Sequence, residues 1–188
     1  TRNARLAAIR SLFGFIARCE PELLVQCGQI RAIPQKLTQH KVVSYLEESE
    51  MNALLNSVDL NSRTGVRDRA LLLLMYNTGA RVSEITGIQL DDLRLDDSAQ
   101  VHLLGKGRKD RSCPLWPETV AALEAYIHEK RTPREATKHV FLNANGRPIT
   151  RFGIRYVIRK YGLRAQPQQR PDSPHNDKLP TPHTIRHT

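Results

Sequence analysis

The feature that most constrains this chain is a break in helical periodicity between residues 29 and 41. This run contains Pro34 and shows no regular spacing of apolar residues, which is typical of a linker. The chain has 188 residues, enough for one ordinary domain or for one domain and a piece of another. We therefore place a boundary after residue 36 and expect two domains, residues 1–36 and residues 37–188.

The segment before this break is predicted to contain one amphipathic helix over residues 2–18, ending near Pro21. Its apolar face is formed by four residues at helical spacing: Leu6, Ile9, Phe13 and Ile16. A single helix cannot bury its own apolar face. We expect it to be the last element of a domain that begins upstream, or to pack on a neighbour.

The second segment is predicted to be mainly helical with a small antiparallel sheet, an α+β fold. Apolar spacing predicts helices over 48–58, 67–77 and 118–129, a short helix from Val82, a helix from Thr150 that Gly162 ends, and a last helix at His183, capped by Thr181 and Pro182. Residues 101–104 and 111–115 are predicted to form a hairpin around the turn 105–108, with 93–95 as a third strand.

Charge points to a polyanionic partner. The chain has 29 Lys and Arg against 19 Asp and Glu, a net charge of +10. The excess is segregated, because residues 131–188 carry twelve basic and three acidic side chains, whereas residues 37–96 carry six and nine. Such segregation favours a docking face for nucleic acid. A solvated basic surface without a partner is the alternative.

Other classes of protein are disfavoured. No stretch approaches the roughly 18 consecutive apolar residues of a membrane span, and arginines interrupt the first twenty residues where a secretory signal would be apolar. We expect a soluble cytoplasmic protein without membrane contact. Cys19, Cys27 and Cys113 are odd in number and lack CxxC spacing, so we expect free thiols and neither a disulfide framework nor a zinc site.

The first candidate cluster is TGARVSEI. Arg81 follows Gly79 at a predicted helix start, where its guanidinium can point with backbone N–H groups towards an anion. Glu84 lies three residues further on and can orient Arg81. A buried Arg81–Glu84 ion pair without any ligand is the alternative.

Two more clusters carry basic or proton-transferring groups. Lys106 lies in a glycine-flanked hairpin turn, from which it can reach a phosphate or a leaving oxygen, although most such turns are only solvated. His183 and Arg186 lie three apart and share a helix face, and His187 follows one turn after His183. A metal site is disfavoured because the HExxH glutamate and a third ligand are missing. Together these groups suit a phosphate whose negative charge grows in a transition state.

The motifs TGARVSEI, GKGRKDRSCPL and PHTIRH resemble, in sequence, order and spacing, the tyrosine recombinase (phage integrase) family, and the resemblance covers nearly the whole chain. It implies that residues 1–36 are the end of a helical core-binding domain with its linker. It also implies that residues 37–188 are most of the catalytic domain, a helical fold with a small antiparallel sheet. No cofactor is implied.

The resemblance also implies roles for individual residues. Arg81 and Arg186 match the two arginines that bind the scissile phosphate, and Glu84 matches the acidic residue that supports the first of them. Lys106 matches the lysine that protonates the leaving 5′ oxygen, and His183 a histidine in proton transfer or phosphate contact.

Further residues complete the expected site. His187 is expected to be structural. Five basic residues are expected to contact double-stranded DNA: Arg108, Lys109, Arg111, Arg151 and Arg155.

One departure from the family pattern concerns the nucleophile. The sequence stops at Thr188, before the position of the family's tyrosine, and its five tyrosines all precede the second arginine. We expect a truncated chain whose complete form cuts and rejoins DNA through a 3′-phosphotyrosyl intermediate, as a homotetramer on two duplexes. The alternatives are a catalytically inert DNA-binding fragment or decayed copy, or a basic helical protein with accidental matches.

Overall fold

The computed structural model describes residues 2–37, 45–105, 110–134, 136–165 and 179–188. It divides into two compact units, Thr1–Val42 and Val43–Thr188. Each unit has its own buried residues.

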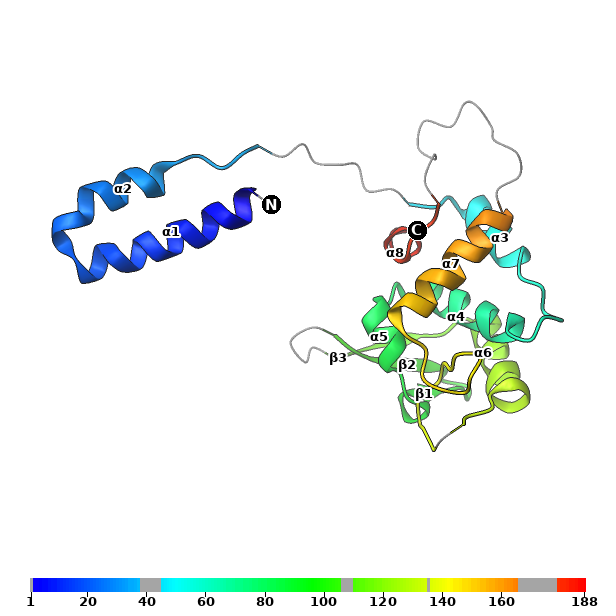
Figure 1. The fold of residues 1–188 in the computed structure, drawn as a ribbon. Helices are drawn as coiled ribbons and strands as arrows, with labels where there is room; N and C mark the ends of the chain where they lie inside the picture. The colour runs from blue at the N-terminus through cyan, green and yellow to red at the C-terminus, as the bar shows by residue number, and fades with distance from the viewer. Residues whose placement is uncertain (1, 38–44, 106–109, 135, 166–178) are drawn as a thin grey trace, which may run out of the picture. The chain divides into compact units, whose positions relative to one another are not determined.

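The first unit is a pair of helices (Figure 1). Helix α1 (Arg2–Cys19) and helix α2 (Leu24–Ala32) pack against each other, joined by a 3-10 turn (Pro21–Leu23). Leu6 of α1 and Cys27 of α2 are the buried apolar residues. The segment after α2 returns to α1, because the Asn3 side chain both donates to and accepts from the Lys36 backbone, at 2.8 and 3.0 Å.

Helix α2 corrects the predicted start of the linker. The predicted helix over 2–18 is confirmed as α1, and its neighbour is α2. However, α2 extends to Ala32, so the expectation that residue 29 lies in a linker is wrong. Gly28 lies within α2, and glycine is a poor helix former, which weakens the helical signal of this segment.

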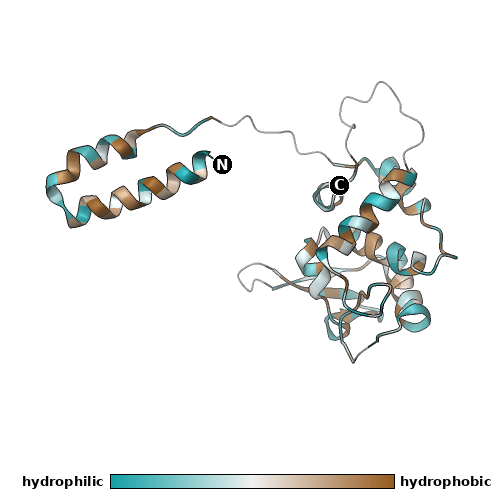
Figure 2. Ribbon diagram, in the orientation of Figure 1, coloured by the Kyte–Doolittle hydropathy of each residue, from teal (hydrophilic) through white to brown (hydrophobic). Residues whose placement is uncertain are grey.

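The second unit is built around one buried helix. Helix α4 (Gly65–Thr78) contains six successive buried residues: Ala70, Leu71, Leu72, Leu73, Leu74 and Met75. It contacts helix α3 (Glu48–Asn56), helix α6 (Pro117–Glu124) with its π-helical extension (Ala125–Lys130), and helix α8 (Pro182–His187). In Figure 2, brown, the colour of hydrophobic residues, alternates with teal along the helices of this unit.

The remaining elements complete the predicted fold class. Helices α5 (Val82–Gly87) and α7 (Arg151–Ala165) pack against each other. Strands β1 (Leu93–Arg94), β2 (Gln100–Leu104) and β3 (Asp110–Pro114) form an antiparallel sheet in the order β1-β2-β3. Buried Val101 and Leu103 alternate with exposed His102 along β2. The expectation of a mainly helical fold with a small antiparallel sheet is confirmed.

Gly162 has a different role from the one expected. It does not end α7, which continues to Ala165. Gly162 is buried, and a Cβ atom there would lie 2.5 Å from Cγ of Pro180, just before α8. The glycine therefore allows close packing between α7 and the start of α8. The predicted cap of α8 is confirmed, since the Thr181 hydroxyl accepts from the Thr184 N–H at 3.2 Å.

Three other expectations concern smaller features. Within the described part of the chain, no helix has both the length and the apolar character required to cross a bilayer. Cys19, Cys27 and Cys113 are free, as predicted. Most of the predicted loop over 164–180 falls on 166–178, outside the described residues.

Candidate functional site

Arg81 is positioned by a sharp turn between two helices. Gly79 ends α4 in the left-handed conformation, with φ of 56°, and its N–H donates to the Met75 carbonyl at 3.0 Å. A glycine adopts this conformation without the strain that a Cβ atom would cause. Arg81 then stands as the N-cap of α5.

Glu84 holds Arg81 from the first turn of α5. Nη1 of Arg81 donates to Oε1 of Glu84 at 2.9 Å, and the Arg81 backbone N–H donates to Oε2 at 2.7 Å. The Glu84 side chain is 2% exposed, whereas the Arg81 side chain is 49% exposed. The contact is thus an ion pair whose carboxylate is buried and whose guanidinium still reaches solvent.

Arg111 of β3 binds the same carboxylate. Its Nη1 donates to Oε1 of Glu84 at 3.1 Å and its Nη2 donates to Oε2 at 2.9 Å. Burial alone would raise the pKa of Glu84, but the hydrogen bonds from Arg111 and Arg81 outweigh burial and lower this pKa from 4.5 to about 2. The hydrogen bond with Glu84 raises the pKa of Arg111. Glu84 is therefore ionised at neutral pH.

Helix α8 brings Arg186 to the same region. A Cβ atom on Gly79 would lie 3.7 Å from the Arg186 carbonyl oxygen and 3.8 Å from its Cγ, so Arg186 lies beside the turn that leads to Arg81. Within α8, Thr184 and Ile185 are buried. The fold thus places Arg81 and Arg186, which are distant in sequence, on neighbouring segments.

The C-terminal residue also anchors α8. The Thr188 hydroxyl accepts from the Leu46 N–H at 3.0 Å and donates to the Thr184 carbonyl at 3.0 Å. His183 lies exposed on the same short helix. The predictions for Lys106, Arg108 and Lys109 fall on 106–109, outside the described residues, as does the side chain of His187.

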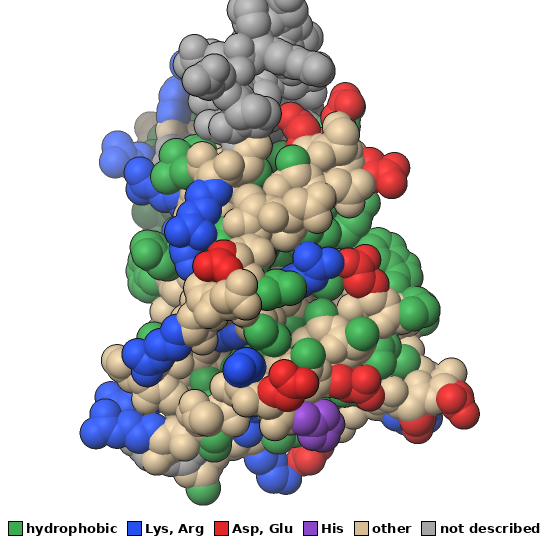
Figure 3. All heavy atoms as spheres, turned by 90° about the vertical axis from the view of Figure 1, so that its right-hand side faces the viewer, with side chains coloured by type: hydrophobic (Ala, Val, Ile, Leu, Met, Phe, Trp, Pro, Cys, Tyr) green, Lys and Arg blue, Asp and Glu red, His purple; other side chains and the backbone are tan. Residues whose placement is uncertain are grey.

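Helix α7 presents exposed arginines and two aromatic rings. Arg151 and Arg155, expected to contact DNA, are both exposed, as is Arg159. Phe152 and Tyr156 are 79% and 68% exposed. Sequence reasoning did not single out these rings as an exposed feature. The available signal was their position, because both fall outside the apolar spacing that identifies the buried face of the helix. On the face drawn in Figure 3, Lys and Arg lie mostly along the left side, and Asp and Glu mostly on the right.

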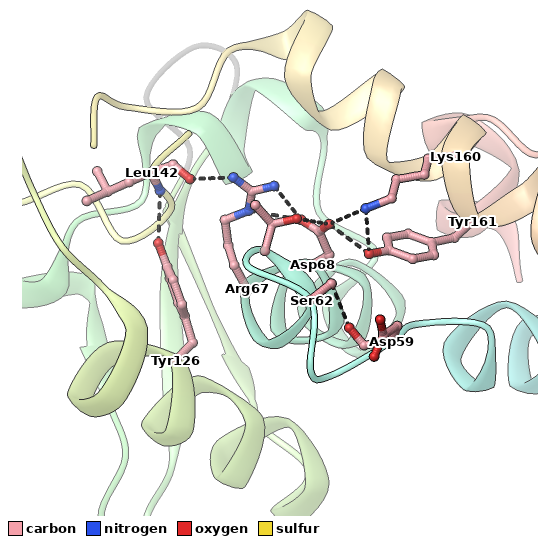
Figure 4. Close-up of polar contacts among 9 residues, drawn as sticks. Asp59, Ser62, Arg67, Asp68, Tyr126, Leu142, Lys160 and Tyr161 are labelled. Carbon is pink, nitrogen blue, oxygen red and sulfur yellow. Dashed lines mark hydrogen bonds and ion pairs between the residues drawn. The ribbon is translucent and has the colours of Figure 1, made fainter. Parts of the chain in front are cut away.

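A buried polar cluster around Asp68 joins α4 to α7 (Figure 4). Asp68 is 1% exposed and accepts hydrogen bonds from the hydroxyls of Tyr161 at 2.9 Å and Thr64 at 3.0 Å. It also pairs with Arg67 at 2.5 Å and with Lys160 at 3.5 Å. Burial raises the pKa of the Tyr161 hydroxyl, which stays protonated and donates to Asp68. This cluster anchors α7.

The same cluster extends to the segment before α7. Arg67 donates to the Leu142 carbonyl at 2.9 Å, and the Leu142 N–H donates to the Tyr126 hydroxyl at 3.0 Å. Sequence reasoning missed the cluster, because an aspartate in the first turn of a predicted helix carries no signal of burial. The sequence does not show that Tyr161 lies opposite it.

Comparison with known proteins gives one consistent result. Residues 44–188 match the sequence profile described as the Phage integrase family. Tyrosine recombinase XerC of Staphylococcus carnosus (strain TM300) is 44% identical over 160 residues, 84% of this chain and 52% of the relative. Tyrosine recombinase XerD of Staphylococcus haemolyticus (strain JCSC1435) is 39% identical over 153 residues, 80% of this chain and 48% of the relative. The chain thus spans about half the length of these relatives.

A solved structure shares the fold. The XerH site-specific recombinase, in a post-cleavage complex with its palindromic difH substrate, superposes with a TM-score of 0.67 at 19% sequence identity. The match covers 84% of this chain and 44% of the XerH chain. At this identity, the similarity shows the fold.

Proposed function

This chain belongs to the phage integrase family, and we propose that it binds double-stranded DNA as part of a site-specific recombinase. The observation that carries the proposal is the placement of Arg81 and Arg186 on neighbouring segments, with Glu84 behind Arg81. Guanidinium groups bind phosphate oxygens through short, charge-assisted hydrogen bonds. The net charge of +10 supports a polyanionic partner.

The proposed reaction uses these groups on one scissile phosphate. Arg81 and Arg186 bind its non-bridging oxygens and stabilise the charge that grows as a tyrosine hydroxyl attacks phosphorus. The bond to the 5′ oxygen breaks, Lys106 protonates that oxygen, and a 3′-phosphotyrosyl link remains. His183 transfers a proton or contacts the phosphate. A 5′-hydroxyl of a second strand then displaces the tyrosine and restores a phosphodiester.

The nucleophile is assigned to none of the five tyrosines in this sequence. The hydroxyls of Tyr126 and Tyr161 are engaged in buried hydrogen bonds, and Tyr76 stacks edge-on against Trp116 with 5.2 Å between ring centroids. Tyr45 and Tyr156 are exposed but do not match the family's nucleophile. These positions favour a second candidate function for the chain as it stands, namely DNA binding without strand cleavage.

DNA binding is tested by titrating the chain with duplex at several salt concentrations. We expect the binding constant to fall steeply with salt, because each phosphate that a basic side chain neutralises releases counterions. Arg186→Ala should weaken binding. The control is Arg94→Ala, which removes a surface arginine paired with Asp96 at 3.3 Å. A binding constant independent of salt would contradict the proposal.

Strand cleavage is tested separately by adding a C-terminal peptide that carries a tyrosine and searching for a covalent protein–DNA adduct. Formation of the adduct supports the recombinase. DNA binding without an adduct favours the inert binding module. For the complete protein we propose a homotetramer on two duplexes, acting on DNA in the cytoplasm at the nucleoid.

A further inference from the structure

Two arginines share the buried carboxylate of Glu84, and they share it unequally. Arg111 commits both terminal nitrogens of its guanidinium to the two carboxylate oxygens. Arg81 contributes one side-chain nitrogen and its backbone N–H. Among the described residues, the structure shows no acceptor for Nε and Nη2 of Arg81. Arg81 therefore keeps donors for another partner, whereas the fork of Arg111 is occupied.

Arg111 also connects two parts of the proposed site. It is the second residue of β3 and lies opposite Leu103 of β2. The turn of this hairpin carries Lys106. Because Glu84 belongs to α5, the Arg111–Glu84 pair attaches the hairpin to the helix whose N-cap is Arg81.

The electrostatic balance of the three side chains depends on Arg111. Two guanidinium groups and one carboxylate leave a net charge of +1 in a cluster whose carboxylate is buried and whose guanidinium groups are partly exposed. Without Arg111, Arg81 alone would balance the charge of Glu84, and each carboxylate oxygen would lose one of its two donors and could accept the remaining donors of Arg81. The planar guanidinium of Arg111 prevents this by donating to both oxygens of Glu84. A lysine ammonium is a point charge and cannot donate to both oxygens in the same geometry.

We propose that Arg111 is a positioning residue. It holds both oxygens of Glu84 so that Arg81 presents its free donors to a DNA phosphate, and it fixes the hairpin relative to Arg81. The inference rests on the proposed function, and it replaces the expectation that Arg111 itself contacts DNA. Arg111 acts through Glu84 and does not touch the phosphate.

The test uses Arg111→Lys in the full chain. Arginine side-chain NMR follows the Nε–Hε signal of Arg81, identified by its loss in Arg81→Lys, and a mixed-sequence duplex measures affinity. We expect the Arg81 signal to shift in the free protein and duplex affinity to fall about tenfold, the size of effect that loss of one hydrogen bond to a charged group produces. Arg94→Lys, the matched control in β1, should change neither measurement.

A second variant keeps the test decisive if Arg111→Lys does not fold. Arg111→Gln removes the two hydrogen bonds from Arg111 to Glu84, leaves Glu84 and Arg81 in place, and should shift the same Arg81 signal. An unshifted Arg81 signal in a folded Arg111→Lys protein would overturn the inference. So would a salt slope that falls by about one in Arg111→Gln while Arg111→Lys binds normally, because that pattern indicates direct phosphate contact. Absence of duplex binding by the unmodified chain would instead overturn the proposed function, since the NMR measurement needs no DNA.

Discussion

At the scale of single residues, the ionised Glu84 is expected to stabilise the fold in a pH-dependent way. Its pKa is about 2 in the folded chain and 4.5 ordinarily. Its contribution is therefore complete above pH 4.5 and is lost as the pH falls towards 2. We expect Glu84→Gln to lower the free energy of unfolding by about 2 kcal/mol at neutral pH. Urea denaturation, followed by fluorescence of the single Trp116, measures the difference.

The control for this prediction is Glu118→Gln. Glu118 pairs with Arg69 at 2.7 Å but its side chain is 58% exposed, so the loss should stay below about 0.5 kcal/mol. The difference in free energy of unfolding between the original chain and Glu84→Gln should become smaller as the pH falls from 4.5 to 2. A constant difference in free energy of unfolding over that interval would show that ionisation of Glu84 does not stabilise the fold.

At the scale of elements, the contact between α7 and the start of α8 depends on Gly162. Alanine is ordinarily the better helix former by about 1 kcal/mol. Here a Cβ atom would lie 2.5 and 2.6 Å from two ring carbons of Pro180, so we expect Gly162→Ala to destabilise the chain by about 2 kcal/mol. Gly87→Ala is the control, since no atom lies within 4 Å of the added Cβ. Equal stability of the two variants in urea would refute the packing role.

The Asp68 cluster gives a second prediction at this scale. Tyr161→Phe removes the hydroxyl that donates to the buried Asp68. We therefore expect the free energy of unfolding, measured by urea denaturation, to fall by about 1 kcal/mol. Tyr156→Phe makes the same chemical change on the exposed face of α7, where the ring is 68% exposed, and should have almost no effect. A loss of similar size in both variants would mean that the hydrogen bond to Asp68 does not anchor α7.

At the scale of the whole molecule, the two units have separate buried cores. All the buried residues of the main core belong to the second unit, from Leu46 to Ile185 in the sequence. Leu6 and Cys27 are buried within the first unit. We expect a chain that starts at Val43 to unfold at the same urea concentration as the full chain, monitored by Trp116. Its duplex binding should depend less on salt, because the removed residues 1–42 carry seven basic and two acidic side chains. A marked shift of the unfolding midpoint would show that the second unit needs the first.

Local chemistry made several elements predictable. The apolar run over 70–75 predicted a buried helix, and alternation over 101–104 predicted a strand, because side chains repeat with periods of 3.6 and 2. Thr181 and Pro182 predicted the start of α8 for an equally local reason. The end of α2 and the role of Gly162 were not predictable. The first depends on packing against α1, and the second on contact with Pro180, which local spacing does not reveal.

The sequence by itself determined which chemical groups are present and in what order: Arg81, Glu84, Lys106, His183 and Arg186 within a basic chain. It also determined the helices and strands that carry the described members of this set. Only the tertiary structure decided which of them meet. Arg111, predicted as a DNA contact, forms an ion pair with Glu84, and the buried Asp68 accepts a hydrogen bond from Tyr161. Such contacts between distant segments depend on how helices and strands pack, and they leave no periodic signal in the sequence.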